Sequence, residues 1–407
     1  MKTGAMVEVI LVWSLLLLAS LTCSVTAARY GVSIGSHGGN LNSWSKSKAT
    51  STRLPSPPSS TRSMIKTNRP VIGILTLPVT LQEEMVFGAQ SFATSYVRLV
   101  QAGGARVAPI FYDSTKEELE AILSKINGVL WTGSLVEFNP SDDEPEGFKY
   151  RRTTEFILEY VIKENEKGNH YPLWGTCLGF ERLMELLVPT ENDETVLEST
   201  DAVDFSTNLD LTSYGVRSRL FRNLSRELLN EVTQPESNIV YNNHELGVHP
   251  AAILRDPWVD FSFQIVSTTR DRNGKEFISS VEGTLMPLYG SQWHPEKSAW
   301  EWNTKLHPSH STMAIEFSNY VGRFFVEECK YNGNSFADVD EESKALIQNW
   351  FSYPTGNCSV FSEVYFFWSP HEDARPSPNT GKLIQLSKSP QLVQSLDPIS
   401  LACISCF

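Results

Sequence analysis

A short stretch from Tyr171 to Phe180 limits the folds open to this chain of 407 residues. It reads YPLWGTCLGF, an apolar run that ends in Gly-x-Cys-x-Gly, and a helix-like run follows it. This order is typical of a strand, a sharp turn and a helix, with Cys177 at the apex of the turn. Gly175 and Gly179 are positions where a side chain would collide with neighbouring backbone. The positive end of the helix would lower the pKa of the thiol, whereas the alternative is an inert buried cysteine.

Apolar runs alternate with helix-like segments before this stretch. The runs at 70–76, 106–110 and 127–134 predict strands, and the segments 91–102, 115–125 and 153–167 predict helices. Such alternation predicts an α/β fold, a three-layer sandwich with a mostly parallel central sheet. Functional groups gather at the carboxyl ends of parallel strands, so Gly133 and Ser134 can be neighbours of Cys177.

The second half of the chain has a different pattern. Residues 195–290 hold short alternating segments that predict antiparallel strands, and 271–274 reads as a hairpin turn. Residues 312–330 predict a closing amphipathic helix. The strand-like run at 288–293 then leads directly to a histidine and a glutamate.

Composition divides the chain into four regions. Residues 1–28 have a short basic start, an apolar core and small residues at the end, which predicts a secretory signal peptide. Residues 29–68 are rich in Ser, Arg, Lys, Gly and Pro and predict a disordered pro-segment or linker. One catalytic domain is predicted over 69–368, and 369–407 is a divergent tail. No segment after the signal is long and apolar enough to span a membrane, so the mature form is expected to have no membrane partner.

Charge and cysteine content exclude several classes of protein. The formal net charge of −13 argues against a nucleic-acid partner, which would need a basic stripe. The pair Cys403 and Cys406 lacks a companion pair, so a zinc site is not expected, and neither is a cofactor. Asn223 and Asn357 each begin an Asn-x-Ser sequon, which a secreted chain can use.

A thiol nucleophile needs a base, a group that orients the base, and donors for an oxyanion. His294 and Glu296 are two residues apart in an extended segment, so the carboxylate can reach the imidazole ring. The alternative for His294 is an ordinary core or surface histidine. The backbone N–H of Leu178 is one expected oxyanion donor, and Gly133-Ser134 offers the second; an ordinary turn at Gly133 is the alternative.

Two blocks of sequence carry a resemblance to a known family. The segments LWGTCLGFE (173–181) and QWHPEK (292–297) resemble those of gamma-glutamyl hydrolases, which belong to the class I glutamine amidotransferase-like superfamily. The resemblance extends over about residues 69–368, and its C-terminal part is similar to plant members. It implies a class I glutamine amidotransferase-like fold with a cysteine at a nucleophile elbow. One departure is Ser134, where the family usually has glycine.

The resemblance also implies an activity and a site. The expected activity is cleavage of γ-glutamyl bonds in folylpoly-γ-glutamates, in the vacuole or outside the cell, by a homodimer. Cys177 would be the nucleophile, His294 the base and acid, and Glu296 the third member of the triad. His244 and Gln292 match residues near the substrate, although His244 can also be read as a loop histidine.

Two other functions remain open from the sequence. A glutamine amidase, or a hydrolase of other γ-glutamyl peptides, would use the same nucleophile, although an amidase needs a partner that accepts ammonia. A non-catalytic binding protein of the same fold is the other, but it would not need both Cys177 and His294. For the hydrolase we expect an optimum on the acid side, at roughly pH 4.5 to 6.5, near the ordinary pKa of histidine.

Overall fold

The computed structural model describes residues 64–79, 87–134, 145–189, 195–357, 359–369 and 371. The predicted signal peptide, most of the predicted linker and residues 372–407 of the tail lie outside these ranges, as do Cys358, Cys403 and Cys406. Within the described ranges, none of the helices has the length and the apolar run needed to cross a membrane.

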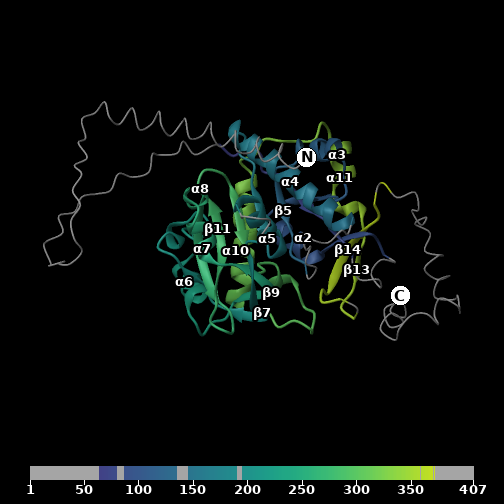
Figure 1. Ribbon diagram of the computed structural model, residues 1–407. Helices are drawn as coiled ribbons and strands as arrows, with labels where there is room; N and C mark the ends of the chain where they lie inside the picture. Colours follow the sequence, from purple (N-terminus) through teal and green to yellow (C-terminus); the bar gives the residue numbers. More distant parts are fainter. Residues whose placement is uncertain are drawn as a thin grey trace, which may run out of the picture. The chain divides into compact units, whose positions relative to one another are not determined.

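A sheet of eight strands lies at the centre of the fold (Figure 1). In spatial order the strands are β4 (Arg106–Ile110), β1 (Val71–Leu75), β5 (Gly128–Trp131), β6 (Leu173–Thr176), β12 (Leu288–Ser291), β11 (Glu276–Gly283), β10 (Phe263–Arg270) and β8 (Asp210–Leu211). The first five run parallel to their neighbours, and the last three join antiparallel. The mostly parallel central sheet is therefore confirmed.

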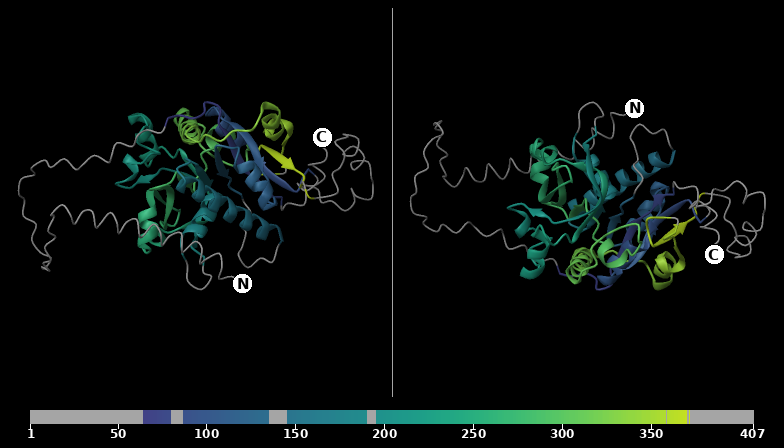
Figure 2. Two further views of the ribbon diagram at one scale, coloured as in Figure 1. Left: turned by 90° about the horizontal axis from the view of Figure 1, so that it is seen from above. Right: turned by 90° about the horizontal axis from the view of Figure 1, so that it is seen from below.

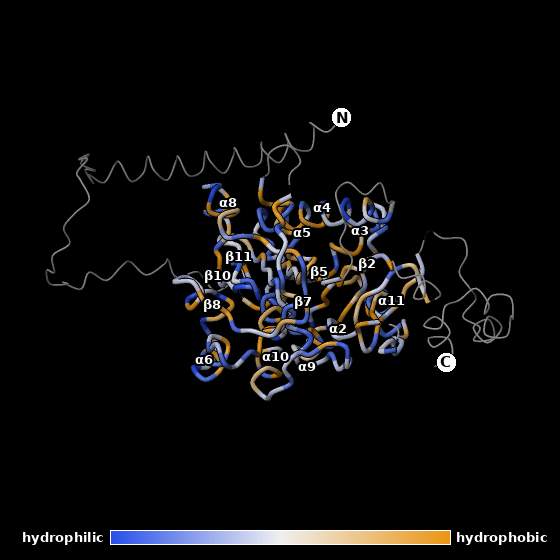
Figure 3. Tube along the Cα trace, turned by 60° about the horizontal axis from the view of Figure 1, so that its bottom comes forward, coloured by the Kyte–Doolittle hydropathy of each residue, from blue (hydrophilic) through white to orange (hydrophobic). Residues whose placement is uncertain are grey.

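Helices cover both faces of this sheet. One face packs against α3 (Lys116–Leu123), α4 (Pro145–Glu166) and α5 (Leu178–Leu187). The other face packs against α2 (Thr94–Ala102), α6 (Arg226–Thr233) and α10 (Thr312–Cys329). The central strands are buried on both sides, as their continuous apolar runs predict. Figure 3 shows hydrophobic residues recurring near α5 and β5, and hydrophilic residues on the outer helix α6. The predicted three-layer α/β sandwich is confirmed.

Side-chain caps mark the starts of several helices, among them α3, α6 and α10. The Thr115 hydroxyl accepts a hydrogen bond from the Glu118 N–H, and the Glu118 carboxylate accepts one from the Thr115 N–H, so the two residues form a capping box at the start of α3. The predicted start of the helix at residue 91 is wrong, because Gln90–Ala93 form strand β3 and α2 begins only at Thr94. That strand forms because it pairs with a segment near the other end of the domain.

Two smaller sheets complete the fold of the described residues. One contains β13 (Ser352–Pro354), β14 (Glu363–Phe367), β3 (Gln90–Ala93) and β2 (Leu77–Pro78), in that order. Figure 2 shows its late strands, in yellow, beside the early strands in blue. The other pairs β7 (Leu197–Thr207) with β9 (Val240–Val248). The remaining short helices are η1 (Gly215–Arg217), α7 (Pro250–Leu254), α8 (Pro257–Ser262), α9 (Lys297–Trp300), α11 (Val339–Ala345) and η2 (Ile347–Asn349).

The predicted hairpin between the antiparallel strands is confirmed. β10 and β11 pair antiparallel on either side of the Asp271–Gly274 turn, and Gly274 has a φ of 81°. The carboxylate of Asp271 accepts hydrogen bonds from the backbone N–H groups of Asn273 and Lys275. β5, β6 and β12 are parallel neighbours, so their carboxyl ends lie side by side at one edge of the sheet, where the candidate site is built.

Candidate active site

Cys177 occupies a strained turn between β6 and α5. Its φ of 51° and ψ of −112° are rare for a residue with a side chain. The turn is tight because an added Cβ at Gly175 would lie 2.5 Å from the Gly179 carbonyl oxygen, and one at Gly179 would lie 2.5 Å from the Trp131 carbonyl oxygen. The predicted nucleophile elbow is therefore confirmed in its geometry.

The adjacent strand β12 brings His294 to the same edge of the sheet. β12 runs parallel to β6, with Ser291 opposite Thr176. The N–H of Cys177 donates a hydrogen bond of 2.8 Å to the Ser291 carbonyl oxygen, which ties the elbow to the end of β12. Three residues later, the N–H of His294 donates to the Tyr241 carbonyl oxygen of β9 across 2.9 Å. Backbone pairing alone thus places this histidine next to the thiol.

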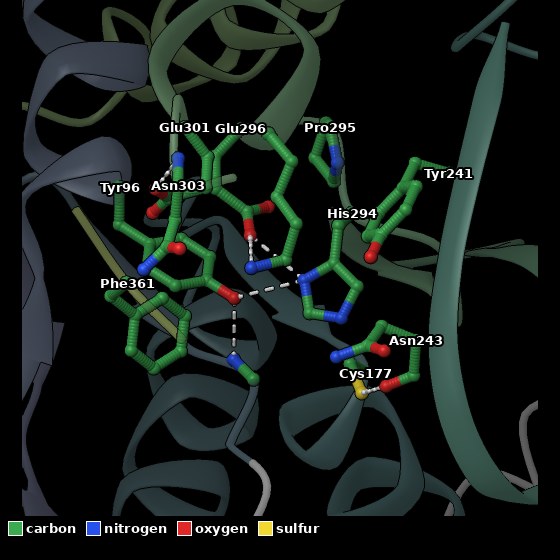
Figure 4. A network of polar contacts seen from close by, with 12 residues as sticks. Tyr96, Cys177, Tyr241, Asn243, His294, Pro295, Glu296, Glu301, Asn303 and Phe361 are labelled. Atoms are coloured by element: carbon green, nitrogen blue, oxygen red, sulfur yellow. Dashed lines mark hydrogen bonds and ion pairs between the residues drawn. The ribbon is translucent and has the colours of Figure 1, made fainter. Parts of the chain in front are cut away.

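His294 and Glu296 form a buried pair. Nδ1 of His294 lies 2.8 Å from Oε1 of Glu296, and the two side chains are 4% and 0% exposed. A carboxylate accepts, so Nδ1 carries the proton and Nε2 holds the free lone pair. Within the described part of the chain, Nε2 has no hydrogen-bond partner. Figure 4 shows this nitrogen directed towards Cys177 and the side chain of Asn243.

The environment favours uncharged Cys177 and His294. Burial raises the pKa of the Cys177 thiol well above its ordinary value, and Glu181 adds to the rise, while the Leu178 N–H and Lys297 act against it. Burial also lowers the pKa of His294, although Glu296 opposes that shift. The predicted lowering of the thiol pKa by the helix is therefore wrong for this structure, because burial outweighs the helix end. Both shifts favour the uncharged form of the side chain.

Glu296 remains the charged member of the group. Burial alone would raise the pKa of this carboxyl, but His294 and Lys297 hold it below its ordinary value. The carboxylate is therefore ionised beside a histidine that donates to it. That arrangement fixes the tautomer of His294 and can stabilise an imidazolium once one forms.

Gly133, two residues after the end of β5, lies beside Cys177 and His294. An added Cβ on Gly133 would lie 2.8 Å from Cε1 of His294, 2.9 Å from the Tyr96 hydroxyl and 3.0 Å from the Cβ of Cys177. The expectation that Gly133 and Cys177 are neighbours is confirmed. Ser134, which follows, does not have a positive φ, so serine fits where glycine is usual.

Tyr96 of α2 is a site residue that the sequence did not indicate. Its hydroxyl accepts a hydrogen bond of 2.8 Å from the Gly133 N–H and lies 3.4 Å from Nδ1 of His294. Burial raises the pKa of Tyr96 well above its ordinary value, and Glu296 adds to the rise, so the hydroxyl stays protonated. Tyr96 was hidden in the sequence because a buried aromatic on the inner stripe of a helix is typical of core packing.

His244 and Asn243 reach the site from β9. The S–H of Cys177 donates to the Asn243 carbonyl oxygen at 3.9 Å. His244 is buried, its Nδ1–H donates to the Leu246 carbonyl oxygen at 2.7 Å, and its ring packs against Phe277. Burial lowers the pKa of His244 to about 3, so the ring is neutral. Asn243 had no signal in the sequence, because its contact with Cys177 is made by the backbone.

Gln292, the first residue of the segment that carries His294, is buried. Its side-chain amide donates a hydrogen bond of 2.7 Å to Oε1 of Glu181, which lies in the first turn of α5. This contact links the segment that carries His294 to the helix behind Cys177. Among the described residues, no group of three or more His, Cys, Asp or Glu side chains is arranged to hold a metal ion.

A thiol at an elbow, beside a histidine–carboxylate pair on a mostly parallel sheet, defines an α/β cysteine hydrolase. Comparison with known proteins narrows this class to one family, because the peptidase C26 family profile matches residues 70–296. The chain belongs to the gamma-glutamyl hydrolases of the peptidase C26 family. Membership of this family agrees with the class I glutamine amidotransferase-like fold that the sequence resemblance implies.

Three relatives illustrate the similarity. Gamma-glutamyl hydrolase B of Dictyostelium discoideum is 33% identical over 300 residues, which cover 74% of this chain and 83% of the relative. Gamma-glutamyl hydrolase of Homo sapiens is 34% identical, with 74% and 90% covered. Gamma-glutamyl hydrolase 1 of Arabidopsis thaliana is 32% identical, with 74% and 84% covered. The similarity therefore extends over most of the length of each relative.

Proposed function

We propose that this chain hydrolyses the γ-glutamyl bonds of folylpoly-γ-glutamates, with Cys177 as the nucleophile. Family membership supports the reaction, and the observation that carries the assignment of residues is the His294–Glu296 pair beside the Cys177 elbow. The family match at residues 70–296 includes all three residues.

The first half of the reaction is acylation. Nε2 of His294 takes the thiol proton as Sγ of Cys177 attacks the γ-carbonyl carbon of the scissile bond. The neutral thiol and imidazole suit a proton transfer that accompanies the attack, rather than a preformed ion pair. Glu296 then stabilises the imidazolium through Nδ1–H. The imidazolium returns the proton to the α-amino group of the departing glutamate, and a thioester on Cys177 remains.

The negative oxygen of the tetrahedral intermediate needs backbone donors. The Leu178 N–H already lowers the pKa of the thiol, which indicates that it points at the sulfur side of the turn. The Gly133 N–H is the proposed second donor, and the oxyanion would displace the Tyr96 hydroxyl from it. Ser134 is the alternative second donor. Water then attacks the thioester with His294 as the base, and the shortened substrate leaves.

His244 is proposed to contact the substrate, and Gln292 is proposed to support the catalytic histidine. His244 is neutral, and its Nε2 has no hydrogen-bond partner among the described residues, so it offers a buried acceptor. Such an acceptor suits an N–H of the substrate. Gln292 is proposed to position the loop of His294 through Glu181, because its amide is already engaged there.

The compartment and the assembly are also proposals. The leader-like residues 1–28 support entry into the secretory pathway, and the vacuole or the extracellular space is the proposed destination. The family resemblance supports a homodimer, which size-exclusion chromatography with light scattering would test.

Incubation of the purified chain with pteroylpentaglutamate, followed by chromatography, tests the proposed function. The expected result is loss of the parent compound and the appearance of shorter pteroyl species with released glutamate or γ-linked oligoglutamate. Glutamine, offered separately, is expected to release little ammonia. Preferential hydrolysis of glutamine, or no cleavage of the pteroyl substrate by folded protein, would contradict the proposal.

A further inference from the structure

A groove between α6 and α10 contains an Asn-x-Ser sequon. The groove has a volume of about 430 Å³, and its lining includes Asn223 and Ser225 of the sequon. Asn223 is exposed in the short segment before α6. Ser225 is the N-cap of α6, where its hydroxyl accepts a hydrogen bond of 3.1 Å from the Leu228 N–H. The sequon thus lies at the protein surface, at the capped start of α6, and far in sequence from the catalytic blocks.

The wall opposite the sequon has the chemistry of a sugar-binding surface. Tyr320 and Phe324 are half-buried, so each leaves part of its ring open to the groove. Exposed Glu316, Arg323 and Glu327 surround them on the same face of α10. Flat apolar rings pack against the C–H faces of a pyranose, and charged groups at the rim hydrogen-bond to its hydroxyls.

We propose that Asn223 carries an N-linked glycan whose first sugars lie in this groove against Tyr320 and Phe324. The step joins Nδ2 of Asn223 to the anomeric carbon of an oligosaccharide carried on a lipid diphosphate. The lipid diphosphate leaves, the amide loses one proton, and no electrons are transferred. The proposal uses the secretory route proposed above and is independent of the catalytic assignment.

Expression of the full chain with its own leader in a eukaryotic secretory host tests occupancy. Glycopeptide mass spectrometry is expected to find a glycan on Asn223. The Asn223→Gln variant is expected to migrate faster on a gel, by the shift of one glycan. Asn357→Gln is the matched control at the second sequon. Modification of Asn357 with Asn223 unmodified would overturn the proposal. A second preparation replaces residues 1–28 with the host's own leader. An unmodified Asn223 in this preparation would also overturn the proposal. Modification in this preparation alone would support the glycan site and reject residues 1–28 as a leader.

Thermal unfolding tests whether the sugars occupy the groove. Trimming the glycan to its first sugar is expected to keep the midpoint temperature, and complete removal is expected to lower it by roughly 2 °C. Phe324→Ala should abolish that difference between trimmed and fully deglycosylated protein. An equal difference with and without Phe324 would overturn the groove contact. Hydrolysis of pteroylpentaglutamate by the same preparations is measured separately, so failure of the two proposals can be distinguished.

A second inference rests on a different observation, the buried Lys297 at the start of α9. Its side chain is 1% exposed, and Nζ lies 3.8 Å from Oε1 of Glu296. Nζ also lies 4.5 Å from the centroid of the Phe361 ring. A buried ammonium is costly unless opposite charge and a polarisable ring surround it. The oxygen of Glu296 that Lys297 approaches is the same one that accepts from His294.

We infer that Lys297 is a positioning residue whose ammonium holds the Glu296 carboxylate in place beside Nδ1 of His294. This inference rests on the proposed function. The charged and titratable groups around the His294–Glu296 pair include Lys297, Cys177, Tyr96, Tyr241 and His244. Buried Glu301 lies in the loop after α9, and Glu181 acts on Cys177. In agreement with the geometry, the Lys297 ammonium lowers the pKa of His294, of Glu296 and of the Cys177 thiol.

The pH dependence of alkylation of Cys177 by iodoacetamide, followed on its own peptide, tests this role without the natural substrate. Loss of the ammonium raises the pKa of His294, so Lys297→Met is expected to move the acid limb upward by about one pH unit. The acid limb of kcat/KM on the pteroyl substrate should move with it. Lys297→Arg keeps the charge and should leave the limb in place, whereas Glu296→Gln should move it downward.

A slower but unshifted profile for Lys297→Met would overturn the inference, because it would indicate packing alone. Lys297→Gln provides a second neutral variant if the methionine variant does not fold, and it is expected to shift the limb in the same direction. An unshifted alkylation profile in the folded glutamine variant would overturn the inference as well. Alkylation that shifts while pteroylpentaglutamate stays intact would support the role of Lys297 and contradict the proposed substrate.

Discussion

The backbone N–H of Gly133 donates a hydrogen bond of 2.8 Å to the hydroxyl oxygen of Tyr96. An oxyanion that uses this N–H must therefore displace the tyrosine hydroxyl. The same glycine is within contact distance of His294 and Cys177, so it has no room for a side chain. Gly133 thus leaves an open space between Cys177 and His294, and its N–H is the proposed oxyanion donor.

Gly133→Ala should lower kcat/KM by at least about 100-fold. The added Cβ would lie 3.0 Å or less from Cε1 of His294, the Tyr96 hydroxyl and the Cβ of Cys177, so the catalytic groups must move apart. Gly356→Ala is the matched control, because its nearest neighbour, Nδ2 of Asn303, would be 3.8 Å away. Initial rates on pteroylpentaglutamate for both variants check this. Near-normal activity of Gly133→Ala would contradict the assigned geometry.

Cys177→Ala should abolish hydrolysis and leave the fold intact. A residue with φ of 51° carries strain that glycine does not, so Cys177→Gly should be more stable than Cys177→Ala by roughly 1 kcal/mol. Urea unfolding of the two inactive variants measures the difference. Activity above a few per cent of wild type (about 5%) in purified Cys177→Ala would refute the nucleophile, and equal stability would refute strain at the elbow.

His294→Asn is expected to reduce kcat by at least about 10³-fold, because the base and the thiol act as a unit. Glu296→Gln keeps an acceptor for Nδ1–H of His294 but removes the charge that stabilises the imidazolium, so its loss should be smaller. Both variants are compared with wild type under saturating substrate. If the glutamine variant were the more damaged, the roles of the two residues would have to be exchanged.

The buried neutral His244 should make stability fall on the acid side. Its pKa is about 3 when folded and 6.5 ordinarily, so the unfolded chain binds the extra proton. This contribution is fully present above pH 6.5 and is lost as the pH falls towards 3, costing roughly 2 kcal/mol by about pH 5. Urea unfolding at neutral pH and near pH 5 measures the loss. His244→Gln should reduce the pH dependence, and an unchanged slope would show that the ring is not buried neutral.

The sequence was sufficient for the groups that come from local signals. Cys177 lies in a glycine-framed turn, and His294 and Glu296 share one short segment, so their pattern is visible without the fold. Tyr96 and Lys297 were missed because an aromatic on an inner helix stripe and a lysine after a carboxylate have common structural explanations. Their roles depend on partners that only the packing of α2, α9 and the loop of Phe361 brings together.

The same distinction explains the error at the start of α2. Residues 91–93 have a pattern compatible with a helix, but they pair with residues 364–366 of β14. Pairing over such a separation in sequence leaves no local signal. The thiol pKa was mispredicted for a related reason, because the helix end is visible in the sequence and the depth of burial is not.

The most direct test of the central claim is kcat/KM for the γ-linked and α-linked isomers of pteroylpentaglutamate, measured from roughly pH 4 to 8. Only the γ-linked isomer places the scissile carbonyl on the glutamate side chain. Cleavage of that isomer alone is expected, with an optimum at roughly pH 4.5 to 6.5. Equal rates on the two isomers, or an alkaline optimum, would contradict it.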